Sequence, residues 1–144
     1  MRILLRRIRL IRIGGYGFKK MKKFILPGSI RSKKNSKRAC MVGGKNAPRR
    51  AVLLPSKAYT EWERQARAAL TPYIDTLFDG PVHVKVTAYI KGAMPDLSGV
   101  LESVGDACEG ILWVDDKQIV SWDGSRVYRD KDNPHTEVEV RAEK

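Results

Sequence analysis

One segment of the chain has the strict alternation of a half-buried strand. From Val82 to Ile90 every second residue is apolar, and polar or amphipathic residues stand between. Successive side chains of a strand point to opposite faces of its sheet, so one face of this strand packs on a core and the other meets solvent. His83 belongs to the second set, and we expect it on the surface of the sheet.

We expect one helix before this strand in the sequence and one helix after it. The first follows Pro55 and Ser56, where Ser56 can cap its N-terminus. Its apolar face recurs at helical spacing and consists of Tyr59, Trp62, Ala66 and Ala69. The second follows the corner 92–96 and ends at Gly110. Its apolar stripe consists of Leu97, Leu101, Val104, Cys108 and Ile111.

The length of 144 residues, 42% of them hydrophobic, allows one modest core. We therefore expect a single α/β domain of the α+β kind, a small mixed β-sheet with two packed helices. Strands and helices alternate too irregularly for a doubly wound sheet. The strands expected in the sheet are a short N-terminal one at 22–26, a hairpin of Arg38–Val42 and Arg50–Leu54, then Val82–Ile90, Gln118–Trp122 and Thr136–Arg141.

The first twenty residues differ from the rest, because Ile and Leu alternate with Arg without a cap or turn that would fix a helix or strand. We interpret residues 1–20 as a basic N-terminal extension, disordered or not translated, and residues 21–144 as the domain. An amphipathic helix on a membrane surface or on DNA is the alternative.

No uncharged apolar run approaches the roughly 18 residues of a membrane span, and arginines interrupt what would be a signal-peptide core. Cys40 and Cys108 lie far apart, with no Cys or His at metal-ligand spacing. Free thiols in a reducing compartment are the default. We therefore expect a cytoplasmic protein that does not bind membranes and has no cysteine nucleophile.

The formal net charge of +12 is unevenly distributed along the chain. Of 28 Lys or Arg residues, 17 lie in residues 1–50, a segment without acidic residues. The rest of the chain contains the other 11 together with all 16 acidic residues. Such a basic arm suits a polyanion, because neutralised phosphates release counterions. We expect a mobile phosphate-contacting loop at residues 29–38, with too little apolar content to pack, and a hairpin with a basic tip. The candidate DNA-binding residues are Lys33, Lys34, Lys37, Arg38, Lys45, Arg49 and Arg50.

Acidic residues gather around the second helix. Asp96 stands at the strand-to-helix corner, and Glu102 and Asp106 share a helix face at i, i+4 spacing. Asp115 and Asp116 follow an apolar run and precede the next strand. Such acids can bind a metal, but Asp96 could equally cap the helix, Glu102 and Asp106 could be solvated, and the Asp pair could form a charged turn.

In this region the sequence resembles the RusA family of Holliday-junction endonucleases. The matching segments are Pro95–Leu97, Asp106–Ala107, Gly110–Asp116 and Gln118–Val120, with Leu54–Tyr59 and Trp62–Glu63 upstream and Asp132–Val140 downstream. The resemblance covers about residues 21–142. No single one of these motifs is specific to the family, but their order and spacing together are specific.

The resemblance implies that Asp96 and Asp116 hold magnesium. It also implies a second corner aspartate and a helical lysine, and this chain has Ser98 and Glu102 in those places, with Gly99 for a usual asparagine. Glu102 is the obvious substitute ligand. The candidate catalytic residues are Asp96, Glu102, Asp116 and Lys117, and the candidate metal ligands are Asp96, Glu102, Asp115 and Asp116. The charge of the missing lysine could come from Lys117, Lys91, Lys33 or Lys34.

We therefore expect a Mg²⁺-dependent endodeoxyribonuclease that resolves four-way junctions or other branched DNA, encoded by a bacterium or a phage. The resemblance implies a homodimer, whose two-fold symmetry suits paired cuts in a junction. A protein that binds branched DNA without cutting it is the alternative, marked by Ser98 and Glu102. A basic RNA-associated protein would explain the isoelectric point near 10.0 but not the acids.

Overall fold

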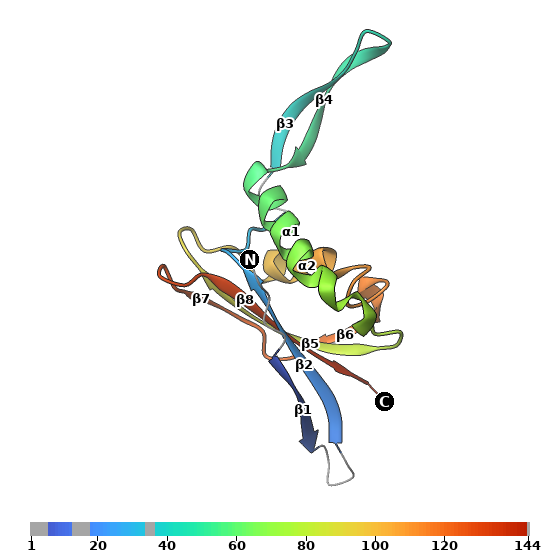
Figure 1. The fold of residues 1–144 in the computed structure, drawn as a ribbon. Helices are drawn as coiled ribbons and strands as arrows, with labels where there is room; N and C mark the ends of the chain where they lie inside the picture. The colour runs from blue at the N-terminus through green and yellow to red at the C-terminus, as the bar shows by residue number, and fades with distance from the viewer. Residues whose placement is uncertain (1–5, 13–17, 34–36, 144) are drawn as a thin grey trace.

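The computed structural model describes residues 6–12, 18–33 and 37–143. In this part of the chain two helices cover one face of a mixed sheet, and a hairpin stands apart (Figure 1). This confirms the expected class of a small α+β domain with a mixed sheet and two packed helices. The helices are α1 Lys57–Leu70 and α2 Leu97–Cys108, with short 3₁₀ turns η1 Thr71–Thr76 and η2 Asp116–Gln118. None of the described helices is long and apolar enough to cross a membrane.

The sheet has the order β1-β2-β8-β5-β6, and β7 also pairs with β5. Its strands are β1 Arg6–Arg12, β2 Phe18–Pro27, β5 Val82–Ile90, β6 Ile119–Trp122, β7 Arg126–Arg129 and β8 His135–Ala142. β2, β8 and β5 pair antiparallel, whereas β6 and β7 run parallel to successive parts of β5. β5 is therefore a central strand, and β6 and β7 lie along its outer side.

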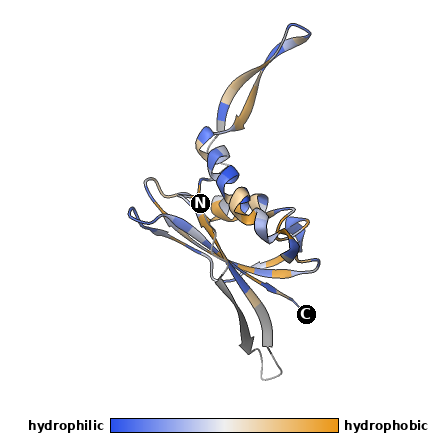
Figure 2. Cartoon of the chain, in the orientation of Figure 1, coloured by the Kyte–Doolittle hydropathy of each residue, from blue (hydrophilic) through white to orange (hydrophobic). Residues whose placement is uncertain are grey.

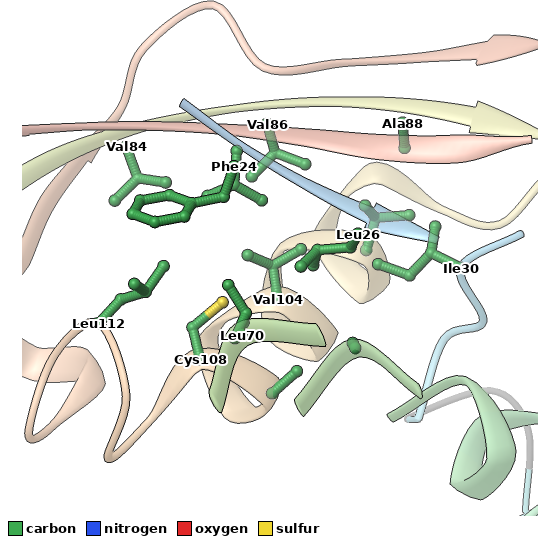
Figure 3. Close-up of a cluster of buried hydrophobic side chains, with 14 of the residues drawn as sticks. Phe24, Leu26, Ile30, Leu70, Val84, Val86, Ala88, Val104, Cys108 and Leu112 are labelled. Atoms are coloured by element: carbon green, nitrogen blue, oxygen red, sulfur yellow. The ribbon is translucent and has the colours of Figure 1, made fainter. Parts of the chain in front are cut away.

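The core lies between the sheet and the two helices (Figure 3). The apolar residues of β5 are buried and the residues between them are half-buried or exposed, which confirms the predicted alternation. Phe24 and Leu26 of β2 and Leu70 of α1 reach the same cluster and are fully buried. Each such side chain stabilises the fold by about 1.5–3 kcal/mol. Burial also raises the pKa of the Cys108 thiol to about 12, which leaves this thiol protonated and unreactive.

α1 forms as its sequence predicts. The Ser56 hydroxyl accepts a hydrogen bond from the backbone N–H of Tyr59, as an N-cap should. The buried side chains of the helix are those of the predicted stripe, together with Leu70.

α2 forms where it is expected, with a buried face that is shifted from the predicted stripe. Val104 and Cys108 of the stripe are buried, but Leu97 is 42% exposed and Leu101 is only partly buried. Val100, Ser103 and Ala107 are buried in addition. Leu101 packs against the core and also lines a groove.

The predicted hairpin exists, but it is not part of the main sheet. β3 Lys37–Gly44 and β4 Ala47–Pro55 form a separate two-stranded sheet that projects beyond the N-terminal end of α1 (Figure 1). Local turn chemistry fixes the pairing of a hairpin but not where it docks, so its placement in the sheet was wrong. Apolar residues run along its strands and hydrophilic residues occupy its tip (Figure 2).

The N-terminal strands are longer than the sequence indicates. β2 begins at Phe18, and residues 6–12 form the edge strand β1 that pairs with it. Residues 6–12 are therefore neither irregular nor helical. The alternation of Arg with Ile and Leu does not by itself determine a strand. The hydrogen bonds to β2 stabilise the strand conformation of this segment. β7, which the sequence analysis does not anticipate, is four residues long and pairs with β5 alone.

Candidate functional site

The corner between β5 and α2 holds Asp96. Its backbone carbonyl accepts the first helical hydrogen bond, from the Val100 N–H at 3.1 Å, so Asp96 is the N-cap residue by backbone geometry. Its side chain makes no capping hydrogen bond and is exposed. Capping does not therefore account for this carboxylate.

The side chain of Gln118 fixes the turn that carries Asp115 and Asp116. Its Oε1 accepts from the backbone N–H groups of Val114 and Asp115, at 2.7 and 3.2 Å. Its Nε2 donates to the carbonyls of residues 78 and 80, at 2.8 and 2.9 Å. The Asp115 side chain accepts from the Lys117 N–H at 2.8 Å and completes a capping box. One amide thus ties the acidic turn to the segment before β5.

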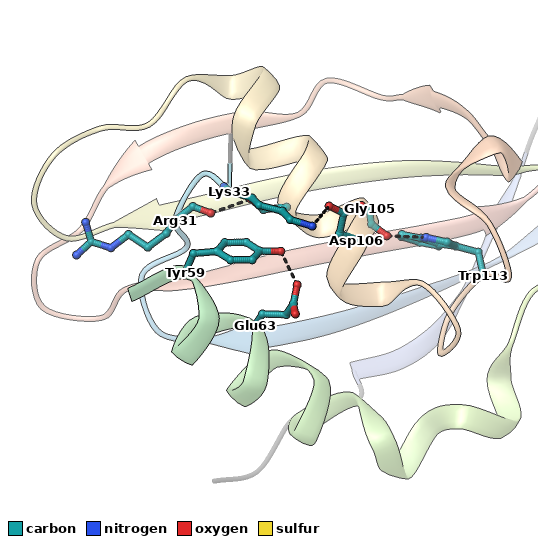
Figure 4. A network of polar contacts seen from close by, with 8 residues as sticks. Arg31, Lys33, Tyr59, Glu63, Gly105, Asp106 and Trp113 are labelled. Atoms are coloured by element: carbon teal, nitrogen blue, oxygen red, sulfur yellow. Dashed lines mark hydrogen bonds and ion pairs between the residues drawn. The ribbon is translucent and has the colours of Figure 1, made fainter. Parts of the chain in front are cut away.

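Trp113 holds the same turn against α2. Its side chain is fully buried, and its indole N–H donates to the Gly105 carbonyl at 3.1 Å (Figure 4). Gly105 also faces the acidic turn, because a Cβ atom at this position would lie 3.8 Å from the Asp116 Cβ. Asp116 therefore lies directly alongside α2.

A groove of about 360 Å³ runs between α2 and β6. It is lined by Ser98, Leu101, Glu102, Gly105, Asp116, Ile119 and Trp122. Of the acids that the sequence singles out, the groove brings together Glu102 and Asp116. Ser98, where the resemblance places an aspartate, lies in it as well. Asp96 stands two residues before Ser98, on the corner from which α2 starts.

A second acidic cluster shares Asp116. Carboxylate oxygens of Glu109, Asp115 and Asp116 all lie within 4.8 Å of one another, a spacing that a metal ion could bridge. Glu109 is not among the candidate ligands of the sequence analysis, which misses this proximity. Glu109 comes close because its backbone bridges to Trp113 and because Arg67 of α1 donates to its carbonyl at 2.9 Å. The first contact is local and the second joins residues 42 apart in the sequence, and neither is visible in the pattern of residue types.

The acids of this turn shift one another's ionisation. A hydrogen bond with Asp115, partial burial and repulsion from Asp115, Glu109 and Asp106 raise the pKa of Asp116. The pKa of Asp115 is lowered, first by the hydrogen bond from the Lys117 backbone. The turn thus concentrates negative charge at Asp116, where a cation would relieve the repulsion.

Residues 29–33 pack against α2, so the expectation of a mobile loop without packing is wrong for this part of the segment. Ile30 is buried, and the Ser103 hydroxyl accepts from the Lys33 N–H at 3.1 Å and donates to the Arg31 carbonyl at 2.8 Å (Figure 4). A Cβ atom at Gly99 would lie 2.3 Å from the Ser32 Oγ. Gly99, which departs from the expected asparagine, therefore makes room for this segment.

The Lys33 ammonium lies 3.4 Å from an Asp106 carboxylate oxygen (Figure 4). Its charge is thus partly neutralised, and Asp106 is engaged outside the groove. Lys34 lies outside the described residues. Lys117 is exposed directly beside the acidic pair and contributes to the low pKa of Asp115.

The remaining basic candidates belong to the hairpin. Lys45, Arg49 and Arg50 are exposed near its tip, and the Arg38 guanidinium donates to the Pro55 carbonyl at its base. Lys37 begins β3. The hairpin leaves the body at the N-terminal end of α1 (Figure 1), whereas the groove lies between α2 and β6.

The family model for the endodeoxyribonuclease RusA matches residues 27–141 of this chain. The matched range runs from the end of β2 through both helices to β8, and it contains the groove, the acidic turn and the hairpin. No match is found among curated proteins.

Gln118→Ala tests the support of the acidic turn. The substitution leaves two backbone N–H groups and two carbonyls without their partners, so we expect the free energy of unfolding to fall by about 2 kcal/mol. Urea denaturation provides the measurement. Gln65→Ala is the matched control, because this amide bonds only the exposed Glu61 carboxylate and its loss should be nearly neutral. Equal effects of the two substitutions would contradict the role of Gln118.

Asp116→Asn tests the repulsion in the turn. A carboxyl whose pKa is raised by folding destabilises the folded state above that pKa, and the destabilisation disappears as the pH falls through it. We therefore expect the metal-free variant to melt at a higher temperature than the parent at pH 7. The difference should shrink under acidic conditions. Thermal unfolding in EDTA at both pH values checks this, and a lower Tm of the variant at pH 7 would refute it.

Proposed function

This chain belongs to the RusA family of endodeoxyribonucleases, and we propose that it cuts branched DNA with Mg²⁺ held at Asp116. The family consists of Holliday-junction resolvases that hydrolyse DNA phosphodiester bonds, so the chain is an endodeoxyribonuclease. The observation that carries the metal proposal is the groove between α2 and β6, where Glu102 and Asp116 lie beside Ser98.

The donors in and around the groove suit magnesium. Carboxylate oxygens are the ligands that this hard cation prefers, and it keeps several waters, so two or three protein ligands suffice. The raised pKa of Asp116 supports the fit, because it reports negative charge that a divalent cation would stabilise. We propose Asp116, Glu102 and Asp96 as ligands on the groove side. Asp115 and Glu109 are the alternatives on the other side of Asp116.

In this proposal the bound ion would polarise the scissile phosphate and lower the pKa of a water molecule. Asp116 and Glu102 orient the site from two sides, one from η2 and the other from α2. Lys117 takes the electrostatic role of the lysine that Glu102 replaces, because it is exposed next to Asp116. Lys33 is the weaker candidate, because Asp106 already compensates its charge.

We propose the basic hairpin as the part that holds DNA phosphates away from the cut. Lys45, Arg49 and Arg50 extend from the body, and no acid lies within β3 or β4. A phosphate backbone would gain counterion release from each contact.

We also propose a homodimer, which two symmetric cuts in a junction require. Met41 and Leu53 are 58% and 71% exposed on the hairpin. Their pairing partners, Ala51 and Ala39, make the middle of that face apolar. A two-stranded sheet is marginally stable alone, so a covering partner is physically reasonable.

A protein that binds branched DNA without cutting it is the second candidate. Ser98 favours it, because a hydroxyl replaces the carboxylate that the family pattern has at this position. Binding and cleavage of a synthetic four-way junction, measured separately with and without Mg²⁺, distinguish the two. Binding without cleavage at any Mg²⁺ concentration would select the second candidate.

Glu102→Gln tests the proposed ligand set. We expect cleavage of a four-way junction to fall at least about 10-fold, as after Asp116→Asn, while junction binding stays unchanged, because the lost charge does not attract phosphate. Ser98→Asp should lower the Mg²⁺ concentration needed for cleavage. Glu61→Gln, an exposed acid on α1, is the control. Glu102→Gln could cleave like the parent while Asp116→Asn and Glu109→Gln are inactive. That result would assign the ion to the Glu109 side of Asp116.

The salt dependence of junction binding tests the hairpin. Combined Lys45→Ala, Arg49→Ala and Arg50→Ala should reduce the slope of log K against log salt concentration by about 2–3, nearly one per lost phosphate contact. Arg64→Ala is the control, since this exposed arginine pairs with Glu61. An unchanged slope in the triple variant would contradict a phosphate-binding role for the hairpin.

A further inference from the structure

The face of the sheet that the helices do not cover has a hollow of about 600 Å³ between β5 and β7. Its lining residues are Lys85, Thr87, Tyr89, Gly124, Arg126 and Tyr128. The β5 residues in this set are the ones that alternate with the buried core positions. The hollow therefore lies on the outer face, and the catalytic groove lies on the helix side.

Three rings form a row across adjacent strands beside this hollow. Tyr128 of β7 stacks on Tyr89 of β5, with centroids 5.6 Å apart, and Tyr89 stacks on His135 of β8 at 4.6 Å. The residues are direct partners in the strand register. His135 is fixed at its two ring nitrogens by the Asn133 carbonyl and the Glu137 carboxylate. The row ends at Tyr128, which is 43% exposed on a strand that pairs, among the described residues, with β5 alone.

Two cationic side chains, Lys85 and Arg126, line the hollow. Among the described residues neither Lys85 nor Arg126 takes part in an ion pair. Glu139, the strand partner of Lys85, has an oxygen 4.0 Å from the Lys23 ammonium, Glu137 also pairs with Lys23, and Asp123 pairs with Arg141. An anionic ligand would thus meet two cations that are outside any ion pair, next to an aromatic surface.

The hollow and the catalytic groove lie on opposite faces of the same sheet edge. β6 contributes Trp122 to the groove, and after the turn at Gly124 the chain contributes Arg126 of β7 to the hollow. The turn is fixed, because the Ser125 hydroxyl accepts from the Val86 N–H at 2.9 Å. Trp122 of the groove and Gly124 of the hollow are therefore only two residues apart in the sequence.

We propose that the hollow binds an unstacked nucleobase of the branched DNA, with its ring against Tyr128 and its phosphate at Lys85 and Arg126. Aromatic side chains flanked by cations bind bases of any sequence, because every base has a π-face. Branch points offer such bases, whereas an intact duplex keeps them stacked. The inference rests on the proposed action on branched DNA but assigns a contact surface separate from the metal groove.

Tyr128→Ala and Tyr128→Phe test the site in the full chain without metal, so that binding is measured independently of cleavage. The probe is a fluorescent oligo-dT, with a duplex of equal length for comparison. We expect Tyr128→Ala to weaken oligo-dT binding about 10-fold, Tyr128→Phe to bind as the parent does, and duplex binding to stay unchanged. Val120→Ala, an apolar residue 50% exposed on the same sheet edge, should behave like the parent.

Several outcomes overturn the proposal. Parent-like oligo-dT binding by Tyr128→Ala removes the stacking role, and equal weakening for oligo-dT and duplex makes the surface a general phosphate contact. A change in molecular mass on Tyr128→Ala, measured by sedimentation, assigns the row to an interface between copies of the chain. Thermal unfolding shows whether Tyr128→Ala has a folding defect. If it does, the double variant Lys85→Ala and Arg126→Ala replaces it as the test. The proposal fails if that double variant binds oligo-dT as the parent does. Loss of cleavage in Glu102→Gln leaves all these measurements unaffected.

Discussion

The position of Asp116 depends on the buried contact between Trp113 and α2. The indole N–H satisfies the Gly105 carbonyl in a place that water does not reach, and the ring fills the space between the acidic turn and the helix. Gly105 has no side chain to push the turn away, so the aspartate lies against the helix that carries Glu102. The Asp116 carboxylate is thus placed by packing on its apolar side, and Gln118 completes the placement from the polar side. Both supports come from within a few residues of the acids.

The same arrangement costs stability, because carboxylates crowd around Asp116 without a matched cation. The raised pKa of Asp116 expresses that cost. The negative charges of two neighbouring acids are stabilised. Asp106 forms an ion pair with Lys33, and Asp115 accepts a hydrogen bond from the Lys117 backbone. Arg67 binds the Glu109 carbonyl, not its carboxylate, so it fixes the residue without neutralising it. Charge is therefore compensated beside Asp116 and left uncompensated at Asp116, as a site prepared for a divalent cation requires.

Local patterns predicted what local forces decide. The alternation in β5, the Ser56 cap and the turn of the hairpin all gave correct elements, and the acids at the corner and in the turn were found by type and order. Three features depended on how the segments of the chain pack and turn, and could not be read from the sequence. The hairpin projects instead of joining the sheet, residues 29–33 pack where Gly99 leaves room, and Glu109 meets Asp116 through the fold of the 109–113 segment. β7 was missed because four residues with little burial carry too short a pattern.

The separation of the basic hairpin from the acidic groove follows from the opposite demands of binding and cleavage. Cations placed in the groove would pair with its carboxylates and compete with a metal ion, so most of the positive charge has to act from a distance. A hairpin strand of nine residues spans about 30 Å, close to one turn of duplex DNA, and can reach phosphates far from the one being cut. Because each proposed contact acts on a uniform backbone, the hairpin would contribute affinity without sequence preference. Recognition of branching must then come from surfaces that distinguish unstacked from stacked bases, and the aromatic row ending at Tyr128 has the chemistry for this distinction.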